Sequence, residues 1–176
     1  SVGTAQQSSI PLQVQASGSI AAWQEMSLGV ELSGVRVAQV LVEVGSPVRT
    51  GQALLLLDAR TLEVQARQAE AGVALARASV DLALAGATRG ESLLAQKLIS
   101  ASNYETLQAD RNRAEAQLTS AVAERDAARL RLGFATLRAP DAGIISARNV
   151  QPGQIVTNGA ELLRLIRRGR IEWRAE

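Results

Sequence analysis

The middle of the chain repeats small and apolar residues at steps that alternate between four and three, and this spacing limits the possible fold more than any other feature. Such a repeat aligns its members along one stripe of an α-helix and is typical of a coiled-coil seam, whereas a half-buried β-strand alternates every second residue. Asp58 stands before the repeat and is placed to cap a helix N-terminus. The repeat then runs through Leu62, Ala66, Ala69, Val73, Ala76, Val80, Ala83 and Ala87. The sequence therefore predicts a long helix that packs along this seam.

A second run shows the same spacing less regularly. Its members are Tyr104, Leu107, Arg111, Ala114, Leu118, Ala121, Arg125, Ala128 and Leu132. The two arginines are expected to lay their aliphatic stems across the seam and keep their charged heads in water. Ser102, followed three residues later by Glu105, fits a capping box at the start of this helix, with Ser100 as the alternative cap. Gly133 is placed to end the helix.

The two helical runs are joined by a short polar break and are expected to form an antiparallel hairpin. The hairpin is assigned to residues 58–133, with its tip at about 90–101. Helices of roughly 35 residues, at 1.5 Å per residue, would project about 50 Å. Alanine at the contact positions lets two backbones approach closely. A lone helix pair buries little apolar surface, so another structure must hold its base.

Two strand-rich segments, 33–57 and 134–168, flank the hairpin and share one pattern. Each contains G-x-x-V-x-x-G-x-x-L, followed three residues later by a further leucine. The matching positions are Gly45, Val48, Gly51, Leu54 and Leu57 in the first segment, and Gly153, Val156, Gly159, Leu162 and Leu165 in the second. The glycines are expected to supply turn conformations with positive φ, and the valines and leucines a shared core. Two such halves would pack as a small β-sandwich, with the hairpin leaving from between them.

Several classes of function are excluded or disfavoured by what the sequence contains. Histidine and cysteine are both absent, which excludes Ser-His-Asp triads, thiol chemistry and the usual zinc sites. The carboxylates stand beside arginines at helical spacing, where they form solvated pairs. We therefore predict neither an enzyme nor a bound cofactor. The net charge is +2 and the arginines are scattered, so nucleic acid is not an expected partner. No apolar run approaches the ~20 residues that cross a bilayer.

The two strand-rich segments resemble the halves of a biotinyl/lipoyl-type domain. The stretches that carry this resemblance are GVRVAQVLVEVGSPVRTGQALLLLD and LRAPDAGIISARNVQPGQIVTNGAELLRLI. A lipoyl-like domain split by a long helical hairpin is similar to the periplasmic adaptors, or membrane fusion proteins, of tripartite efflux pumps. The resemblance covers residues 33–176. It implies an α+β fold: a split lipoyl-like β-sandwich with a long inserted antiparallel coiled-coil hairpin.

The resemblance also implies what lies at the two ends of the chain. Residues 1–32 contain short alternating stretches such as PLQVQA and are expected to form strands of the β-barrel and membrane-proximal regions, after a flexible lead-in over 1–9. Residues 169–176 would begin the β-barrel domain. Because complete adaptors continue into these domains, the chain is interpreted as a fragment. Trp23 and Trp173 lie outside the repeats and are expected to pack on neighbouring domains.

The break between the helices contains Arg89, Leu93 and Ser100 at the spacing R-x-x-x-L-x-x-x-x-x-x-S. This spacing resembles the hairpin tip of adaptors that engage TolC-like outer-membrane channels, and the resemblance implies that these residues dock the channel. A guanidinium offers donors in a fixed fork, and a leucine can enter a groove between channel helices. Each residue also has a structural alternative: Arg89 as a solvated charge, Leu93 as closure of the hairpin end, and Ser100 as a helix cap.

By resemblance, the chain is a periplasmic adaptor that links an inner-membrane transporter of the resistance-nodulation-division type to the outer-membrane channel. The full-length protein would be anchored to the inner membrane and would assemble as a ring of six copies. An adaptor of an ABC-type or type I export system is the alternative. A lipoyl or biotinyl carrier is disfavoured because the only lysine, Lys97, lies in the predicted tip without the flanking residues of carriers. A purely structural coiled-coil scaffold is the remaining hypothesis.

Overall fold

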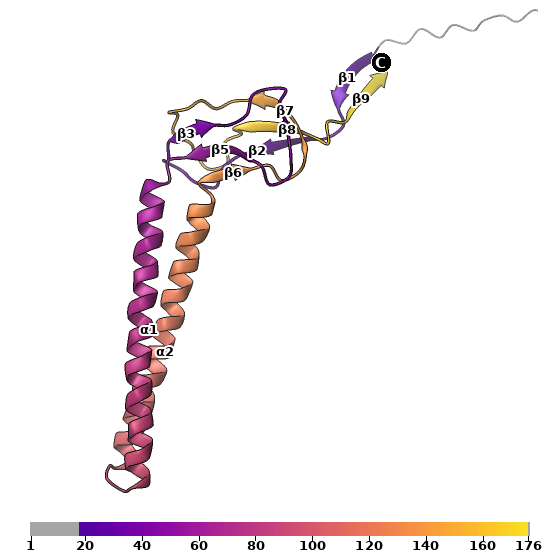
Figure 1. Cartoon of the computed structure of the whole chain (residues 1–176). Helices are drawn as coiled ribbons and strands as arrows, with labels where there is room; N and C mark the ends of the chain where they lie inside the picture. The colour runs from indigo at the N-terminus through magenta and orange to yellow at the C-terminus, as the bar shows by residue number, and fades with distance from the viewer. Residues whose placement is uncertain (1–17, 176) are drawn as a thin grey trace, which may run out of the picture.

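The structure is a computed structural model that describes residues 18–175. It consists of a small β module, a long helical hairpin that projects from one side of the module, and a separate two-stranded ribbon on the other side (Figure 1). The expected lead-in over 1–9 lies outside the described residues. The strands are β1 (Gly18–Ala22), β2 (Glu25–Leu28), β3 (Val37–Val40), β4 (Pro47–Val48), β5 (Ala53–Leu57), β6 (Thr136–Arg138), β7 (Gly143–Arg148), β8 (Leu163–Arg167) and β9 (Ile171–Ala175), and the helices are α1 (Arg60–Ala95) and α2 (Ala101–Gly133).

The β module is built from two antiparallel sheets that each combine strands from both sides of the hairpin. One sheet has the order β2-β8-β7-β4 and the other the order β3-β5-β6. The pairing of β5 with β6 joins the last strand before α1 to the first strand after α2. The module is therefore one folded unit, although more than seventy residues of hairpin interrupt it in the sequence.

The repeated glycine, valine and leucine pattern has the roles that the sequence predicts. All four glycines have positive φ, with values of 88° at both Gly45 and Gly153 and of 79° and 80° at Gly51 and Gly159. The valines and leucines of the pattern are buried in one core: Val48, Leu54, Leu57, Val156, Leu162 and Leu165. Because equivalent positions turn and pack alike, the two halves are related in structure as well as in sequence.

Strand β2 differs from the expectation that residues 1–32 form strands of the β-barrel and membrane-proximal regions. β2 pairs with β8 inside the β module, and Leu28 and Val30 are buried in the module's core. These residues therefore complete the module instead of pairing with a separate domain, because their apolar side chains are needed to close the core. Of the two described strands before residue 33, β1 alone lies outside the module, and it pairs along its length with β9 to form the ribbon.

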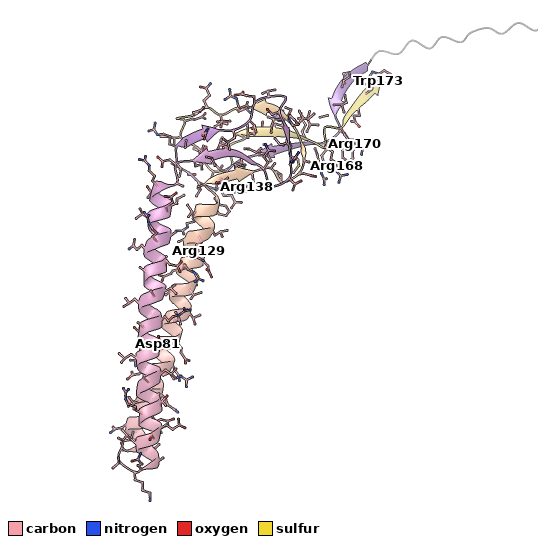
Figure 2. All side chains as sticks on the ribbon, in the orientation of Figure 1. Asp81, Arg129, Arg138, Arg168, Arg170 and Trp173 are labelled. Carbon is pink, nitrogen blue, oxygen red and sulfur yellow. The ribbon has the colours of Figure 1, made fainter. Side chains whose placement is uncertain are left out.

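Both tryptophans lie at the ribbon or at its junction with the module. Trp173 is on β9, and its ring is exposed (Figure 2). Trp23 follows β1, and the guanidinium carbon of Arg170 lies 4.8 Å from its ring centroid, a cation–π arrangement. That both rings pack on neighbouring domains stays a prediction.

The hairpin follows the predicted seams closely. All eight predicted positions of α1 are buried or half-buried, as are all predicted positions of α2 except Arg111. Arg111 is exposed and forms an ion pair with Glu115, one helical turn away. Arg125 behaves as expected: its side chain is 22% exposed, and its head reaches Asp126. Alanine dominates the seam, so the two helices lie side by side (Figure 1).

Helix α1 is long and apolar enough, by length and composition alone, to cross a bilayer. In the structure it lies along α2 instead, and most of its apolar window is not buried by that contact. The apolar content of α1 therefore exceeds what the seam with α2 uses.

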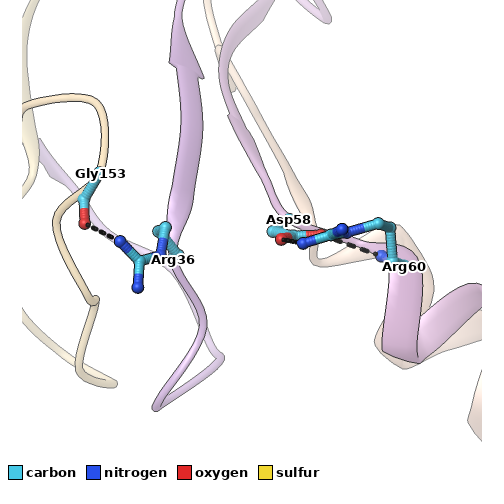
Figure 3. A network of polar contacts seen from close by, with 4 residues as sticks. All are labelled: Arg36, Asp58, Arg60 and Gly153. Carbon is cyan, nitrogen blue, oxygen red and sulfur yellow. Dashed lines mark hydrogen bonds and ion pairs between the residues drawn. The ribbon is translucent and has the colours of Figure 1, made fainter.

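Polar contacts fix the base of the hairpin to the β module (Figure 3). The Arg36 carbonyl accepts a hydrogen bond from the backbone of Asp58, and the Arg36 guanidinium donates to the carbonyl of Gly153 in the other half of the module. The N-cap of α1 is Ala59, so the prediction that Asp58 is the cap is wrong by one residue. The Asp58 carboxylate still accepts the backbone N–H of Arg60, at 3.3 Å, and pairs with the Arg60 guanidinium. Hydrogen bonds from Arg60 lower the pKa of Asp58 to about 2.

Candidate functional site

The turn at the hairpin tip is a compact helix C-cap. The Lys97 N–H donates to the Leu94 carbonyl, and the Leu98 N–H donates to the Leu93 carbonyl, both at 2.8 Å. These two bonds define a Schellman motif, in which the residue after the cap takes the left-handed conformation. Lys97 occupies that position with φ 58°, where glycine is usual. The only lysine of the chain is therefore part of the backbone turn as well as an exposed charge.

Ser100 is the N-cap of α2. Its backbone is extended, and its Oγ accepts the N–H of Asn103 at 3.1 Å. The alternative cap is thus confirmed, and the capping box at Ser102 and Glu105 is wrong. Ser102 lies within the first turn of α2, where its carbonyl accepts the Thr106 hydroxyl. A cap needs a non-helical backbone, which Ser102 does not have.

Arg89 and Leu93 lie one helical turn apart at the end of α1 and line the same shallow groove. The groove has a volume of about 450 Å³ and runs between the two helices near the tip. Its other lining residues are Gly86, Gly90, Ile99, Asn103, Thr106 and Leu107. Leu93 is 38% exposed, so part of its side chain closes the hairpin and part faces outward. The structure brings the predicted arginine and leucine together on one surface.

The arginines of the hairpin differ in whether a carboxylate pairs with them. Further along the hairpin, Arg113 pairs with Asp110, and Arg129 pairs with Glu70 across the two helices. Within residues 18–175, the guanidinium of Arg89 has no hydrogen-bond or ion-pair partner, and its side chain is exposed. A guanidinium in this state offers its donors to carbonyl or carboxylate oxygens of another molecule.

Ser100 stands across the turn from Arg89 and Leu93 and does not line their groove. Because its Oγ accepts the Asn103 N–H, the hydroxyl proton remains for donation to a partner. The three predicted residues therefore belong to one end of the hairpin, with two on a shared groove and the third at the head of α2. This arrangement can bind by hydrogen bonds and apolar contact. Among residues 18–175, no cluster of three or more acidic side chains could hold a metal ion.

Gly90 is a helix-packing position beneath the groove that the sequence predictions missed. It is buried, and a Cβ built on it would collide with Cδ1 of Leu107 and lie 3.4 Å from Cδ2 of Tyr104. The absence of a side chain therefore lets the two helices meet beneath the groove. The signal was present in the sequence, because Gly90 continues the seam three residues after Ala87.

Comparison with known proteins gives distant but extended similarity, and no family model matches the chain. Over 151 residues the chain is 29% identical to the multidrug efflux pump subunit AcrA of Escherichia coli K12, covering 85% of this chain and 38% of that protein. The multidrug export protein AcrE of the same organism is 30% identical over 151 residues, covering 85% of this chain and 39% of that protein. The chain thus spans well under half of these curated relatives.

Solved structures share the fold. MacA from Actinobacillus actinomycetemcomitans matches with a TM-score of 0.64 at 24% identity, covering 91% of this chain and 54% of that chain. The match includes most of the chain and hence the hairpin together with the β module. At distant identity, the chain is thus similar in sequence to subunits of multidrug efflux pumps over most of its length and shares the fold of MacA.

Proposed function

We propose that the protein is the periplasmic adaptor of a tripartite efflux system and that its hairpin tip docks a TolC-like outer-membrane channel. The adaptor would link an inner-membrane transporter to that channel across the periplasm. The observation that carries the proposal is the tip itself, where Arg89, which has no partner among the described residues, shares a groove with the half-exposed Leu93 at the far end of the hairpin.

The distance that the hairpin bridges supports a linking role. Helix α1 has 36 residues, which at 1.5 Å per residue extend about 54 Å from the β module. The base of the hairpin is tied to both halves of the module, through Asp58 and Arg36. A helix pair held in this way keeps the tip at a fixed position relative to the module. The proposed mechanism is therefore to couple the transporter to the channel and to seal the passage between them, with no covalent step.

Docking would combine three kinds of contact at the tip. Arg89 would donate to oxygen atoms on the channel, Leu93 would enter an apolar groove between channel helices, and Ser100 would donate its hydroxyl proton. The structural roles of Leu93 and Ser100 do not compete with docking. The Ser100 side chain is held by its cap hydrogen bond, and the Leu93 side chain is partly buried. Both are therefore already ordered and lose little conformational entropy on binding.

The transporter partner is proposed to be of the resistance-nodulation-division type, with ABC-type and type I export systems as the alternative. The relatives named as multidrug efflux pump subunits favour a pump adaptor. The protein would act in the periplasm, anchored to the inner membrane in its full length, and copies would assemble as a ring of six. Identification of a neighbouring transporter gene would distinguish the two transporter classes.

The carrier hypothesis requires a different position for Lys97. A carrier lysine must be presented by the β module, but Lys97 lies in the C-cap of α1 at the far end of the hairpin. Mass spectrometry of the native protein tests this directly. A lipoyl or biotinyl adduct on Lys97 would overturn the adaptor proposal.

The docking proposal is tested by substitutions at the tip of the full-length protein in cells. Arg89→Glu, Leu93→Ala and Ser100→Asp should each lower drug resistance by several-fold while leaving the helical content unchanged. Asp is as good an N-cap as Ser, so Ser100→Asp keeps the cap while it removes the hydroxyl donor and places a negative charge at the tip. Arg77→Glu, at an exposed position in the middle of α1, is the matched control and should leave resistance unchanged. Unchanged resistance in all three tip variants would remove the docking role.

A further inference from the structure

The turn formed by residues 157–160, shortly before β8, carries the only Asn-Gly pair in the sequence. The Ala160 N–H donates to the Thr157 carbonyl at 3.3 Å, which closes the turn. Gly159 has a φ of 80°, whereas Asn158 has no positive φ, and this is the pattern of a type II turn. Both residues are exposed. The turn therefore presents an asparagine side chain to solvent beside a residue that has no side chain.

An Asn-Gly pair can lose ammonia without any enzyme. The deprotonated backbone nitrogen of the glycine attacks the side-chain carbonyl carbon of the asparagine, the bond from that carbon to the amide nitrogen breaks, and ammonia leaves. Water then opens the resulting cyclic imide at one of its two carbonyl carbons. One opening gives aspartate in a normal backbone, and the other gives isoaspartate, in which the main chain runs through the former side chain. Glycine favours the attack because it has no Cβ to hinder the approach.

The structure leaves both reacting groups of this pair available. Within residues 18–175, neither the Gly159 N–H nor the Asn158 side-chain amide has a hydrogen-bond partner. Apart from its chain neighbours, no atom lies within 4 Å of the position that a Gly159 Cβ would take. The nitrogen can therefore lose its proton to solvent, and the asparagine side chain has room to rotate towards it.

The first half of the β module contains the same turn with its nitrogen engaged. Residues 49–52 form the equivalent turn, in which Gly51 has a φ of 79°. Thr50 stands there in place of Asn158. The Gly51 N–H donates to the Ala139 carbonyl at 2.8 Å. The two turns therefore share a shape but differ in whether the backbone nitrogen is available to react.

The other asparagines of the chain lack these conditions. Asn103 and Asn112 lie in α2, where the backbone N–H groups are held by helical hydrogen bonds. Asn149 donates its side-chain amide to Glu161 at 3.2 Å. It is followed by Val150, a buried β-branched residue that hinders the attacking nitrogen. The combination of a glycine neighbour, an available nitrogen and an exposed side chain thus occurs at Asn158.

We infer that Asn158 is a site of spontaneous deamidation in the folded protein and that isoaspartate formed there loosens the β module. The Asn158 N–H donates to the Ser33 hydroxyl oxygen at 2.8 Å. The Ala160 carbonyl oxygen lies 2.6 Å from the position of a Gly29 Cβ, so it packs against the backbone there. An extra methylene in the main chain of the turn would displace these contacts. The inference concerns the β module and does not depend on the proposed function.

Incubation of the purified full-length protein in isotopically labelled water tests the inference. The folded protein is kept in mildly alkaline buffer prepared with heavy-oxygen water and is then digested with trypsin in ordinary water. Acid formed during the incubation carries the label, whereas acid formed during the digestion does not. Trypsin cleaves after arginine, so one peptide, 149–164, contains both Asn149 and Asn158. We expect labelled aspartate and isoaspartate at Asn158 and intact asparagine at Asn149.

Thr50→Asn is the matched variant, because it places a second Asn-Gly pair in the equivalent turn of the same molecule. In the folded variant, Asn158 should deamidate several-fold faster than the introduced asparagine, since the Gly51 N–H is bound to a carbonyl. In concentrated urea, where neither turn is formed, the two pairs should react at similar rates. Labelling of Asn158 in urea but not in the folded protein would overturn the inference, as would equal rates at the two pairs in the folded variant.

The effect on the β module is tested separately. The isoaspartate form is isolated by ion-exchange chromatography and compared with Asn158→Asp, which adds the same charge but keeps the normal backbone. The isoaspartate form should unfold at a lower urea concentration than Asn158→Asp. Equal unfolding midpoints would show that the turn accommodates the longer backbone, and would overturn the claim that the modification loosens the module.

Discussion

Among single residues, Lys97 holds the most unusual backbone conformation in the hairpin. Its φ of 58° lies in the left-handed region, which costs a residue with a Cβ roughly 1–2 kcal/mol. The surrounding Schellman bonds hold it there.

Lys97→Gly should raise the free energy of unfolding by about 1 kcal/mol, because glycine adopts positive φ without steric cost. Urea unfolding followed by circular dichroism measures the change. Lys97→Ala removes the same charge but keeps the Cβ, so it should give no comparable gain. Equal stabilisation by both substitutions would mean that charge, and not backbone conformation, limits stability here.

The carboxyl group of Asp58 should titrate far below its usual range. Hydrogen bonds from Arg60 lower its pKa from 3.8 to about 2. Because the pKa is depressed in the folded state, the stability that it contributes is complete above the unfolded value and is lost as the pH falls through about 2. In an NMR titration, Arg60→Ala should return the pKa of Asp58 towards 3.8. An unchanged pKa in that variant would show that the pair does not form in solution.

At the scale of elements, the close approach of α1 and α2 near the tip depends on Gly90. Gly90→Ala should lower the free energy of unfolding by about 1–3 kcal/mol, because the new methyl group overpacks against Leu107. Adding Leu107→Ala should recover part of the loss by making room. Thermal unfolding monitored at 222 nm measures both variants.

Gly72→Ala is the matched control for Gly90→Ala, which tests the close approach of α1 and α2. Gly72 is also in α1, but no atom lies within 4 Å of the position that its Cβ would take. Replacing a helical glycine with alanine in open space should stabilise the helix by about 0.5–1 kcal/mol. Opposite signs at the two glycines would support a tight contact at Gly90, whereas stabilisation at both would contradict it.

For the molecule as a whole, the β module should fold without the hairpin. The Leu57 N–H donates to the Ala135 carbonyl at 2.8 Å, so the chain ends left by removing residues 60–133 already lie together. Joining them through a short glycine-containing turn should give a protein with a cooperative unfolding transition and the dispersed amide spectrum of a β-sandwich. A disordered spectrum would mean that the hairpin is needed to bring the two halves together.

The sequence determined the periodic parts of this protein by itself. Helical seams and the repeated turn glycines follow from local spacing, since a helix places every third or fourth residue on one stripe and a positive φ favours glycine. The buried leucines, the paired helices and the location of Arg89, Leu93 and Ser100 at one end were therefore predictable.

Only the tertiary structure decided what depends on partners distant in sequence. The backbone conformation at the start of α2 makes Ser100, and not Ser102, the N-cap. The pairing of β2 with β8, which places β2 in the β module, also depends on residues distant in sequence. The groove that Arg89 and Leu93 line above Gly90 likewise needed the second helix, which supplies Asn103, Thr106 and Leu107. Local spacing sets which face of an element is apolar, but which surface covers that face is fixed by long-range packing, and one sequence pattern is compatible with several such surfaces.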